Sequence, residues 1–269
     1  MYKRQLGNWL ANNQRQGVNV SLLFQKYARW SKVRDSTRNL TGIDMSGSGS
    51  RETNSLRRQH LKDVAGLTHT RPQDYEVLKE RYFFDQRYSF VRKTSTRLLV
   101  GFAGTGSVFE NSILLHPLYG FPMIHGSSLK GLARSYCVES GVGADKLLRM
   151  FGNEPEKEGR EGEVVFMDAW PEEWPERGGF LELDVMTPHY GRYYRKVGPP
   201  ADNDSPNPIV FLAVPAGIRF RFCLHPSRTC KEEDIVREAK DYLILALEKF
   251  GVGAKTGSSY GYFVRTGTK

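Results

Sequence analysis

Apolar residues follow two different periodicities, one in the first third of the chain and another in the remainder. Up to about residue 92 they recur at the three- and four-residue intervals of a helix, first between Leu22 and Trp30 and again over residues 74–91. A run of glycine and serine at residues 45–50 is typical of a flexible loop. We therefore expect residues 1–92 to form a basic, helical N-terminal extension.

From residue 93 onward, strand-like and helical segments alternate. Short apolar or alternating runs predict strands at residues 97–103, 163–169, 180–186, 209–214, 218–224 and 260–265. Longer runs with a single apolar stripe predict helices at residues 127–140 and 232–250. The first of these helices opens with Ser127 and Ser128, which are good N-cap residues.

The order of these elements is strand, helix, strands, helix and strand, with an additional hairpin and long loops inserted. This split βαβ order predicts an α+β fold with a single ferredoxin-like, RNA-recognition-motif-like core over residues 93–269. The sequence contains no visible internal repeat, so we expect one such core. A fold of this kind serves many functions, and the function has to be inferred from charge and motifs.

The charge balance favours a polyanionic partner. Lys and Arg number 39 against 30 Asp and Glu, which gives a formal net charge of +9 and a pI near 9.4. Such a surplus promotes binding by release of counterions, but charge alone does not separate RNA from DNA or from anionic lipid. Nucleic-acid binding is therefore one of the function classes to test against the motifs.

Other features of composition indicate a cytoplasmic protein without a cofactor. Hydrophobic residues make up 39%, as in globular proteins, and the longest apolar runs have the length of strands. No apolar segment follows the basic N-terminus, so we expect no signal peptide. The three cysteines, Cys137, Cys223 and Cys230, form no CxxC pair, and we expect neither a disulfide framework nor a metal site.

The first motif is the start of the helix predicted at residues 127–140. A glycine and two serines leave backbone N–H groups at the helix start, where the helix dipole adds positive potential. Lys130 and Arg134 follow on one face, and such a start can hold a phosphate. The alternative is an ordinary capped helix with two exposed cations.

The second motif is a glycine-rich loop at residues 251–261. It is not a P-loop, because the GxxxxGK[ST] spacing is absent and the loop runs from a helix into a strand. Its glycines permit close approach of a ligand to the backbone, beside Lys255, Thr256 and Ser258. The alternative is a tight helix-to-strand connection with Gly251 at the end of the helix.

The third motif interleaves aromatic and cationic residues between Asp184 and Lys196. Rings that stack on bases and cations that meet phosphates suit single-stranded RNA, which makes Arg192, Arg195 and Lys196 candidate RNA-binding residues. Tyrosine and arginine are also favoured in protein interfaces, so a contact with another subunit remains the alternative.

Together these segments resemble a known family. IHGSSLKGLAR (124–134), GVGAKTGSSYGYF (251–263) and VGFAGTG (100–106) resemble the signature stretches of the RAMP superfamily, the repeat-associated subunits of type III CRISPR complexes. Residues 151–171 and 184–217 are similar to the sixth-subunit branch of the type III-B (Cmr) complexes in particular. The resemblance covers roughly residues 97–263.

The resemblance implies a modified RNA-recognition-motif fold and a structural role. Such a subunit caps the helical backbone near the 3′ side of the guide RNA and helps to hold guide and target RNA. It lies beside the repeating backbone subunit and the small helical subunit. By the same resemblance, Ser127, Ser128, Lys130 and Arg134 contact the guide backbone, and the loop residues Lys255, Thr256 and Ser258 support that helix or reach RNA.

The resemblance also implies that the chain is not an enzyme. The backbone subunit that cuts target RNA carries an aspartate before the GSSLKG helix, where this sequence has Glu110. A glutamate is chemically able to act as an acid, and His125 and His189 are the histidines that a guide-processing endoribonuclease of the same superfamily would use. That nuclease is one alternative function, and a protein-binding end cap without RNA contact is the other.

Overall fold

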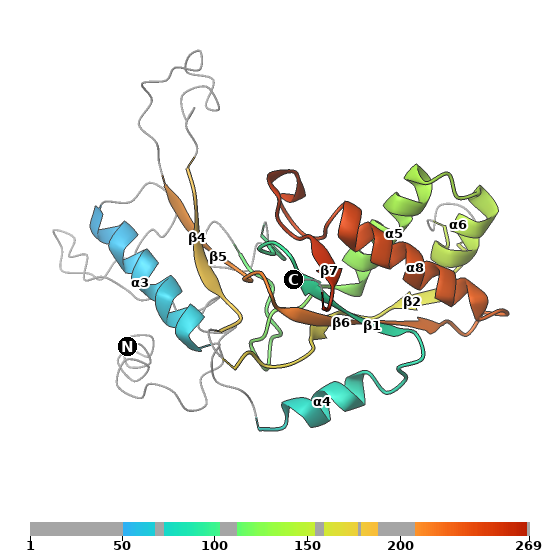
Figure 1. The fold of residues 1–269 in the computed structure, drawn as a ribbon, viewed down its shortest axis with the longest axis horizontal. Coiled ribbons are helices and arrows are strands. Elements are labelled where there is room, and N and C mark those ends of the chain that lie inside the picture. Colours follow the sequence, from blue (N-terminus) through green and yellow to red (C-terminus); the bar gives the residue numbers. More distant parts are fainter. Residues whose placement is uncertain are drawn as a thin grey trace, which may run out of the picture.

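The computed structural model describes residues 51–67, 73–102, 112–153, 159–176, 179–187 and 208–267. They form a mixed α+β fold with antiparallel sheets, in which a larger sheet carries helices and a two-stranded sheet lies to its side (Figure 1). One hydrophobic core runs through the arrangement, from Leu61 in the first described helix to Phe263 in the last strand. The described parts of the N-terminal third and of the remainder therefore share a core.

The larger sheet has the strand order β2-β6-β1-β7, and all neighbouring strands are antiparallel. Phe220 and Phe222 of the long central strand β6 are fully buried, while Arg219 and Arg221 point to the opposite face, which confirms the predicted alternation. The strands of this sheet are β1 (Ser89–Thr94), β2 (Val164–Phe166), β6 (Arg219–Pro226) and β7 (Phe263–Arg265), with the short β3 (Trp170–Pro171) also paired to β6.

Two long helices cover the face of the sheet that carries these phenylalanines. Helix α5 (Gly126–Glu139) lies between β1 and β2 in the sequence, and helix α8 (Asp234–Lys249) lies between β6 and β7. They pack on each other and on the sheet (Figure 1). Both predicted helices are confirmed, because each buries one apolar stripe at helical spacing. The buried stripe of α8 consists of Ile235, Val236, Ala239, Leu243, Ala246 and Leu247.

The opposite face of the sheet is partly covered by the chain itself. Helix α4 (Tyr75–Tyr82) lies on the side away from α5 and α8 (Figure 1), and the rings of Tyr82 and Trp170 stack with centroids 4.0 Å apart. The guanidinium of Arg221 donates two 2.6 Å hydrogen bonds to Glu172. The sheet face on which RNA-recognition domains stack bases is therefore engaged here in contacts within the chain.

The inserted hairpin forms a separate two-stranded sheet. Strands β4 (Glu182–Met186) and β5 (Ile209–Ala213) lie where the sequence predicts strands, and they pair antiparallel along their whole length. Helix α3 (Arg51–Leu67) packs against both strands (Figure 1). One further short helix, α6 (Ala144–Phe151), follows α5 and was not anticipated from the sequence.

The first strand does not lie where the sequence places it. Residues 74–91 are helical only as far as Tyr82, and β1 begins at Ser89, so the predicted border at residues 92/93 falls inside a strand. The alternation of apolar and polar residues typical of a strand is not visible in this sequence, because the charged Arg92 points to the core face. There its guanidinium lies 3.4 Å from the carboxylate of Glu248 in α8. The helical interpretation of residues 83–91 is wrong.

In the apolar run predicted as a strand at residues 97–103, Leu98, Leu99 and Val100 are buried as expected, but the described part, residues 97–102, is irregular extended chain. Its hydrogen bonds go to three different segments: Leu98 pairs with Val214, while the carbonyls of Leu99 and Val100 accept from Ala254 and Leu114. A strand ladder needs successive bonds to one partner. The prediction of a strand is therefore wrong, although the prediction of burial is confirmed for Leu98, Leu99 and Val100.

Several predicted features lie outside the described residues. These are the helical patches before residue 51, the Gly/Ser loop at residues 45–50, Glu110, His189, and the cationic residues Arg192, Arg195 and Lys196. Among the helices that the structure does describe, none combines the length and apolar character that crossing a bilayer requires.

Candidate functional site

The segment 97–102, whose residues Leu98, Leu99 and Val100 are buried, is where the glycine-bearing motifs of the sequence meet in space. The Leu99 carbonyl accepts a 2.8 Å hydrogen bond from the Ala254 amide, and the Arg97 carbonyl accepts one of 2.7 Å from Gly261. On the other side, the amides of Ser112 and Leu114 donate to the carbonyls of Phe102 and Val100. The segment thus lies between residues 112–114 and the loop that follows α8.

Two glycines of that loop are required by contacts within the chain. A Cβ on Gly253 would lie 2.2 Å from the Leu99 carbonyl oxygen, and a Cβ on Gly261 would lie 2.0 Å from that of Val252. Both residues have positive φ, +95° and +80°. The sequence interpretation that these glycines open the backbone to a ligand is therefore wrong for this pair, because the chain itself makes the close approach.

The loop holds two residues other than glycine in the left-handed region. Lys255 has φ 59° and Ser259 has φ 64°, and the 3₁₀ turn Thr256–Ser258 lies between them. The Lys255 ammonium lies 5.5 Å from the centre of the Phe102 ring, a cation–π distance. The loop conformation therefore places this lysine beside the 97–102 segment.

An open groove of about 620 Å³ lies between this loop and helix α5. Its walls combine two aromatic rings, small residues and three hydroxyls, and none of its side chains is charged. The lining residues are Gly101, Phe102, Ser128, Leu132, Ser135, Phe250, Gly251, Val252, Gly253, Ala254 and Thr256. All three glycine-bearing motifs of the sequence contribute to this groove.

The start of α5 differs from the prediction. The helix begins at Gly126, so Ser127 and Ser128 lie in its first turn, and the N-cap residue is His125, which forms no side-chain capping bond. The Gly126 amide instead donates a 2.7 Å hydrogen bond to Oδ1 of Asp168. The prediction of a serine N-cap is wrong, and a carboxylate from the segment after β2 caps this helix.

Glycine is also required at this helix start. A Cβ on Gly126 would lie 2.0 Å from the carbonyl oxygen of Phe166, so only glycine lets α5 begin this close to strand β2. Packing against β2 therefore explains the glycine of the motif Gly126-Ser127-Ser128. The two serines are exposed to solvent.

The predicted RNA-binding residues of α5 divide between two faces. Ser128 lines the groove together with Leu132. Lys130 and Arg134 are each two residues from Leu132, and because a helix turns about 100° per residue they point to nearly the opposite side. Of the predicted site residues, the structure brings Ser128 and Thr256 into the groove, while Ser127, Arg134 and Ser258 lie exposed outside it.

His125 has an acidic neighbour that the sequence did not reveal. Its Nδ1 lies 3.6 Å from Oδ1 of Asp168, 43 residues further along the chain. The same oxygen accepts the Gly126 amide at the shorter distance of 2.7 Å. The carboxylate is thus engaged in capping α5, and the histidine lies beside a bond that holds the helix in place.

A partly buried tyrosine connects the loop to the hairpin. The Tyr260 hydroxyl donates a 2.6 Å hydrogen bond to Asp184 of β4, and Nη1 of Arg97 lies 3.5 Å from the same carboxylate. Burial, reinforced by the bond to the Asp184 carboxylate, raises the pKa of Tyr260 to about 12. Tyr260 also packs with Phe211 in a small apolar cluster of its own. The loop and the base of the β4–β5 hairpin are therefore joined.

The excess positive charge is unevenly distributed. Residues 1–50, which lie outside the described part, carry eight Lys and Arg against two Asp and Glu, a net charge of +6 out of the total of +9. Within the described residues, no group of three or more His, Cys, Asp or Glu side chains is arranged to hold a metal ion. Charge alone therefore does not identify the site. The sequence analysis missed Ser135 and Phe250, which lie outside the motifs, and Phe102, which lies within one but is uncharged and has no distinguishing polar group.

Comparison with known proteins relates the chain to one family. The family model of the RAMP superfamily matches residues 93–264. The Cmr6 subunit of a CRISPR system from Pyrococcus furiosus is 32% identical over 64% of this chain and 66% of its own length. The Cmr6 subunit from Saccharolobus solfataricus is 34% identical over 63% of this chain. The match spans about half, 55%, of that second relative's length.

A solved structure shows the same fold. A chain in the cryo-EM structure of the type III-B Cmr-β complex bound to cognate target RNA aligns with a TM-score of 0.65 at 23% identity. The alignment covers 97% of this chain and 85% of that one.

We predict that Gly253→Ala destabilises the protein by about 2–4 kcal/mol, because it combines an unfavourable positive φ with overlap against the Leu99 carbonyl. The matched control is Gly257→Ala in the same loop, whose Cβ would meet nothing within 4 Å. Its free energy of unfolding should change by no more than about 0.5 kcal/mol. Urea unfolding of both variants measures the difference, and equal stability would contradict the close contact.

Proposed function

The chain belongs to the RAMP superfamily, and from that premise we propose that it is a non-catalytic, RNA-binding subunit of a type III-B CRISPR ribonucleoprotein, of the Cmr6 kind. The identity to two Cmr6 subunits supports the assignment to this branch. In this role the chain caps the backbone of the complex near the 3′ side of the guide RNA and helps to hold guide and target RNA. Its partners are the other Cmr subunits, above all the repeating backbone subunit.

The observation that carries the RNA-binding proposal is the groove between α5 and the loop after α8. Three segments that are far apart in the sequence line it, and they are the segments that carry the family resemblance. The rings of Phe102 and Phe250 offer apolar faces for a base, and the hydroxyls of Ser128, Ser135 and Thr256 offer hydrogen bonds to ribose or phosphate. Lys255 lies next to the groove and supplies positive charge.

The topology supports a ferredoxin-like core as the scaffold of this groove. The strand order β2-β6-β1-β7 with helices α5 and α8 on one face matches a split βαβ arrangement. Because the opposite sheet face is engaged by α4 and by the ion pair of Arg221, RNA binding is proposed on the helix side of the sheet.

The outer face of α5 is proposed as a second, purely electrostatic contact. Lys130 and Arg134 point away from the groove and lie one helical turn apart. Neither the groove nor this pair reads base edges, so binding should tolerate changes of RNA sequence.

Replacing Lys130 and Arg134 together by alanine should weaken binding of single-stranded RNA and reduce its salt dependence. Each lost phosphate contact removes about 0.7 from the slope of log K against log salt, so the double variant should lose about 1.4. Fluorescence anisotropy with a labelled RNA over a salt series measures this slope.

The matched control is the pair Arg228 and Lys231, which are exposed before α8. They lie about 24 Å from the groove, since α8 has 16 residues at about 1.5 Å each and its C-terminal end reaches the groove. Their replacement by alanine should leave the slope near that of the wild type. An unchanged slope in the Lys130/Arg134 variant would show that α5 makes no phosphate contact.

Filling the groove should weaken RNA binding without changing the salt slope. The indole of Ser128→Trp would occupy the space between Phe102 and the loop, and loss of one stacked base costs about 1–3 kcal/mol, or roughly 5- to 150-fold in affinity. Ser140→Trp adds the same side chain at the exposed C-terminal cap of α5, about 18 Å along the helix from Ser128, and should bind RNA like the wild type. Equal affinity of the two variants would place the RNA elsewhere.

The non-catalytic part of the proposal has its own test in the reconstituted complex. Glu110→Ala, His125→Ala and His189→Ala should each leave single-turnover cleavage of target RNA nearly unchanged at every cut site. A lost acid–base group slows such a step by about a hundredfold or more. His125 is the most informative of the three, because Asp168 lies beside it. Loss of one cut site in an intact complex would make that residue catalytic and overturn the non-catalytic assignment.

A further inference from the structure

An exposed aromatic patch lies at the far end of the sheet from the groove-forming loop. Phe84 has 77% of its surface exposed, the largest value among the hydrophobic residues described as exposed. Its ring stacks on that of His225, with centroids 5.1 Å apart and only 4° between the planes. Val165 of the edge strand β2 is the cross-strand neighbour of His225 and is 38% exposed. These three residues form what we call the Phe84 patch.

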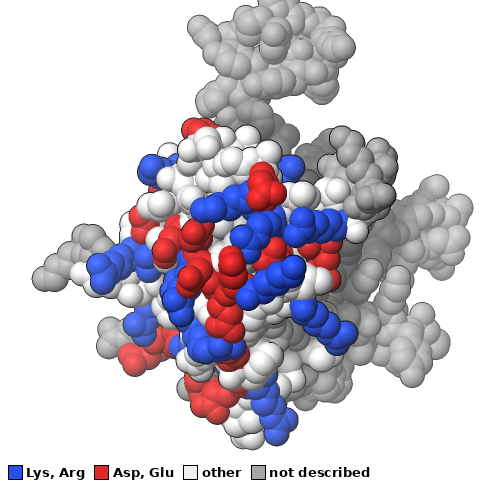
Figure 2. Space-filling view, turned by 90° about the vertical axis from the view of Figure 1, so that its right-hand side faces the viewer, with Lys and Arg blue, Asp and Glu red and all other residues white. Residues whose placement is uncertain are grey.

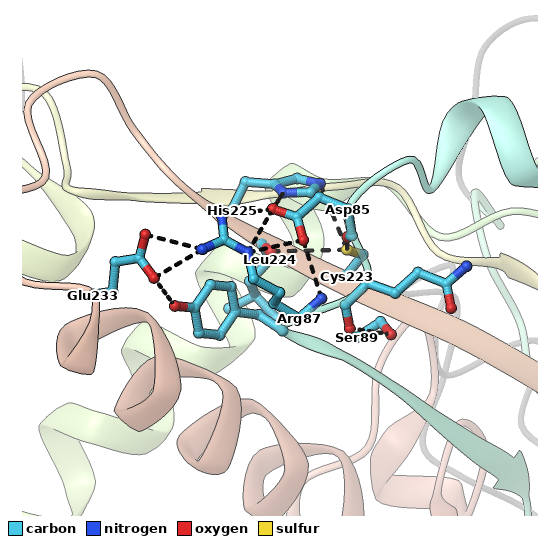
Figure 3. Close-up of polar contacts among 9 residues, drawn as sticks. Asp85, Arg87, Ser89, Cys223, Leu224, His225 and Glu233 are labelled. Atoms are coloured by element: carbon cyan, nitrogen blue, oxygen red, sulfur yellow. Dashed lines mark hydrogen bonds and ion pairs between the residues drawn. The ribbon is translucent and has the colours of Figure 1, made fainter.

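The imidazole beneath Phe84 is fixed by its neighbours. One carboxylate oxygen of Asp85 lies 3.8 Å from Nδ1 of His225, and the Cys223 thiol lies 3.5 Å from Nε2 (Figure 3). The same thiol donates to the Asp85 carbonyl at 3.2 Å. An exposed ring backed by a fixed ring loses little conformational freedom when it is covered, which favours binding.

Two arginines at this end of the molecule, Arg87 and Arg149, are paired with carboxylates of the same chain. Arg87 lies between Asp85 and Glu233, with Nη–O distances of 2.8 Å and 3.1 Å (Figure 3). On the same end of the molecule Arg149 pairs with Glu163 at 3.0 Å, and also with Glu232. In a view of this end, Lys and Arg are interleaved with Asp and Glu and form no single-sign surface (Figure 2).

This charge balance argues against RNA as the partner of the patch. A protein gains affinity for nucleic acid when its Lys and Arg side chains neutralise phosphates. Cations that are already paired with carboxylates contribute little to this affinity. A protein partner, by contrast, gains binding free energy by burying an apolar centre whose surrounding polar groups already have hydrogen-bond or ion-pair partners. The patch therefore has the anatomy of a protein contact.

We propose that the Phe84 patch is a docking point for a neighbouring protein subunit, whose contacting surface is apolar and without net charge and receives the Phe84 ring. The inference rests on the proposed role as a subunit of a ribonucleoprotein, but it concerns a surface separate from the RNA groove. The chain would thus use one site for RNA and another, at the end of the sheet, for protein.

The test measures protein association and RNA binding separately. The full chain is added to a complex reconstituted from the remaining Cmr subunits and guide RNA, and incorporation is followed by mass photometry over a concentration series. Phe84→Ala should weaken incorporation at least about tenfold, as for a buried aromatic at an interface. Phe84→Leu, which keeps an apolar side chain, should stay within about threefold of the wild type.

Leu118→Ala is the matched control, because Leu118 is 70% exposed on a different loop. It should be incorporated like the wild type, and all three variants should bind RNA as isolated chains with unchanged affinity. An effect of Phe84→Ala no larger than that of the control would overturn the proposal. Loss of RNA affinity with both Phe84 variants would make the patch a base-stacking platform instead, and self-association of the isolated chain that depends on Phe84 would make the partner a second copy.

Discussion

The close contact between Gly253 and Leu99 is the constraint on which the site depends. It brings the loop after α8 within hydrogen-bonding distance of the segment 97–102, and the Ala254 amide then donates to the carbonyl of the buried Leu99. That segment in turn pairs with Val214 at the end of β5. One wall of the groove, the loop itself and the base of the hairpin are therefore positioned by a contact that only glycine permits.

Much of the architecture could be predicted because it follows from apolar periodicity. The stripes of α5 and α8 and the alternation of Phe220 and Phe222 with arginine are local signals, and each is confirmed. Strand β1 could not be found in this way, since Arg92 on its core face is stabilised by Glu248 from a distant helix. The cap of α5 was missed for the same reason, because Asp168 lies 42 residues from Gly126.

The candidate site shows the same limit. Sequence motifs identified the segments that form the groove, but not which of their side chains enter it. Lys130 and Arg134 attract notice by their charge, yet helix geometry turns them away from Leu132 and the groove. Phe102 and Phe250 line the groove and carry no sequence signal of their own. One face of α5 thus lines the groove, and the opposite face carries the two cations. The sequence motif contains both sets of residues, and only the folded structure shows that they lie on different faces.

In the proposed role, RNA occupies the groove between α5 and the glycine-bearing loop. The most direct measurement is a cryo-EM structure of this chain assembled with its partner subunits, guide RNA and target RNA. We expect a nucleotide in the groove, with its base against Phe102 or Phe250 and its backbone or ribose within hydrogen-bonding distance of Ser128 and Thr256. A groove filled by a side chain of another subunit, with all RNA contacts elsewhere on the chain, would contradict it.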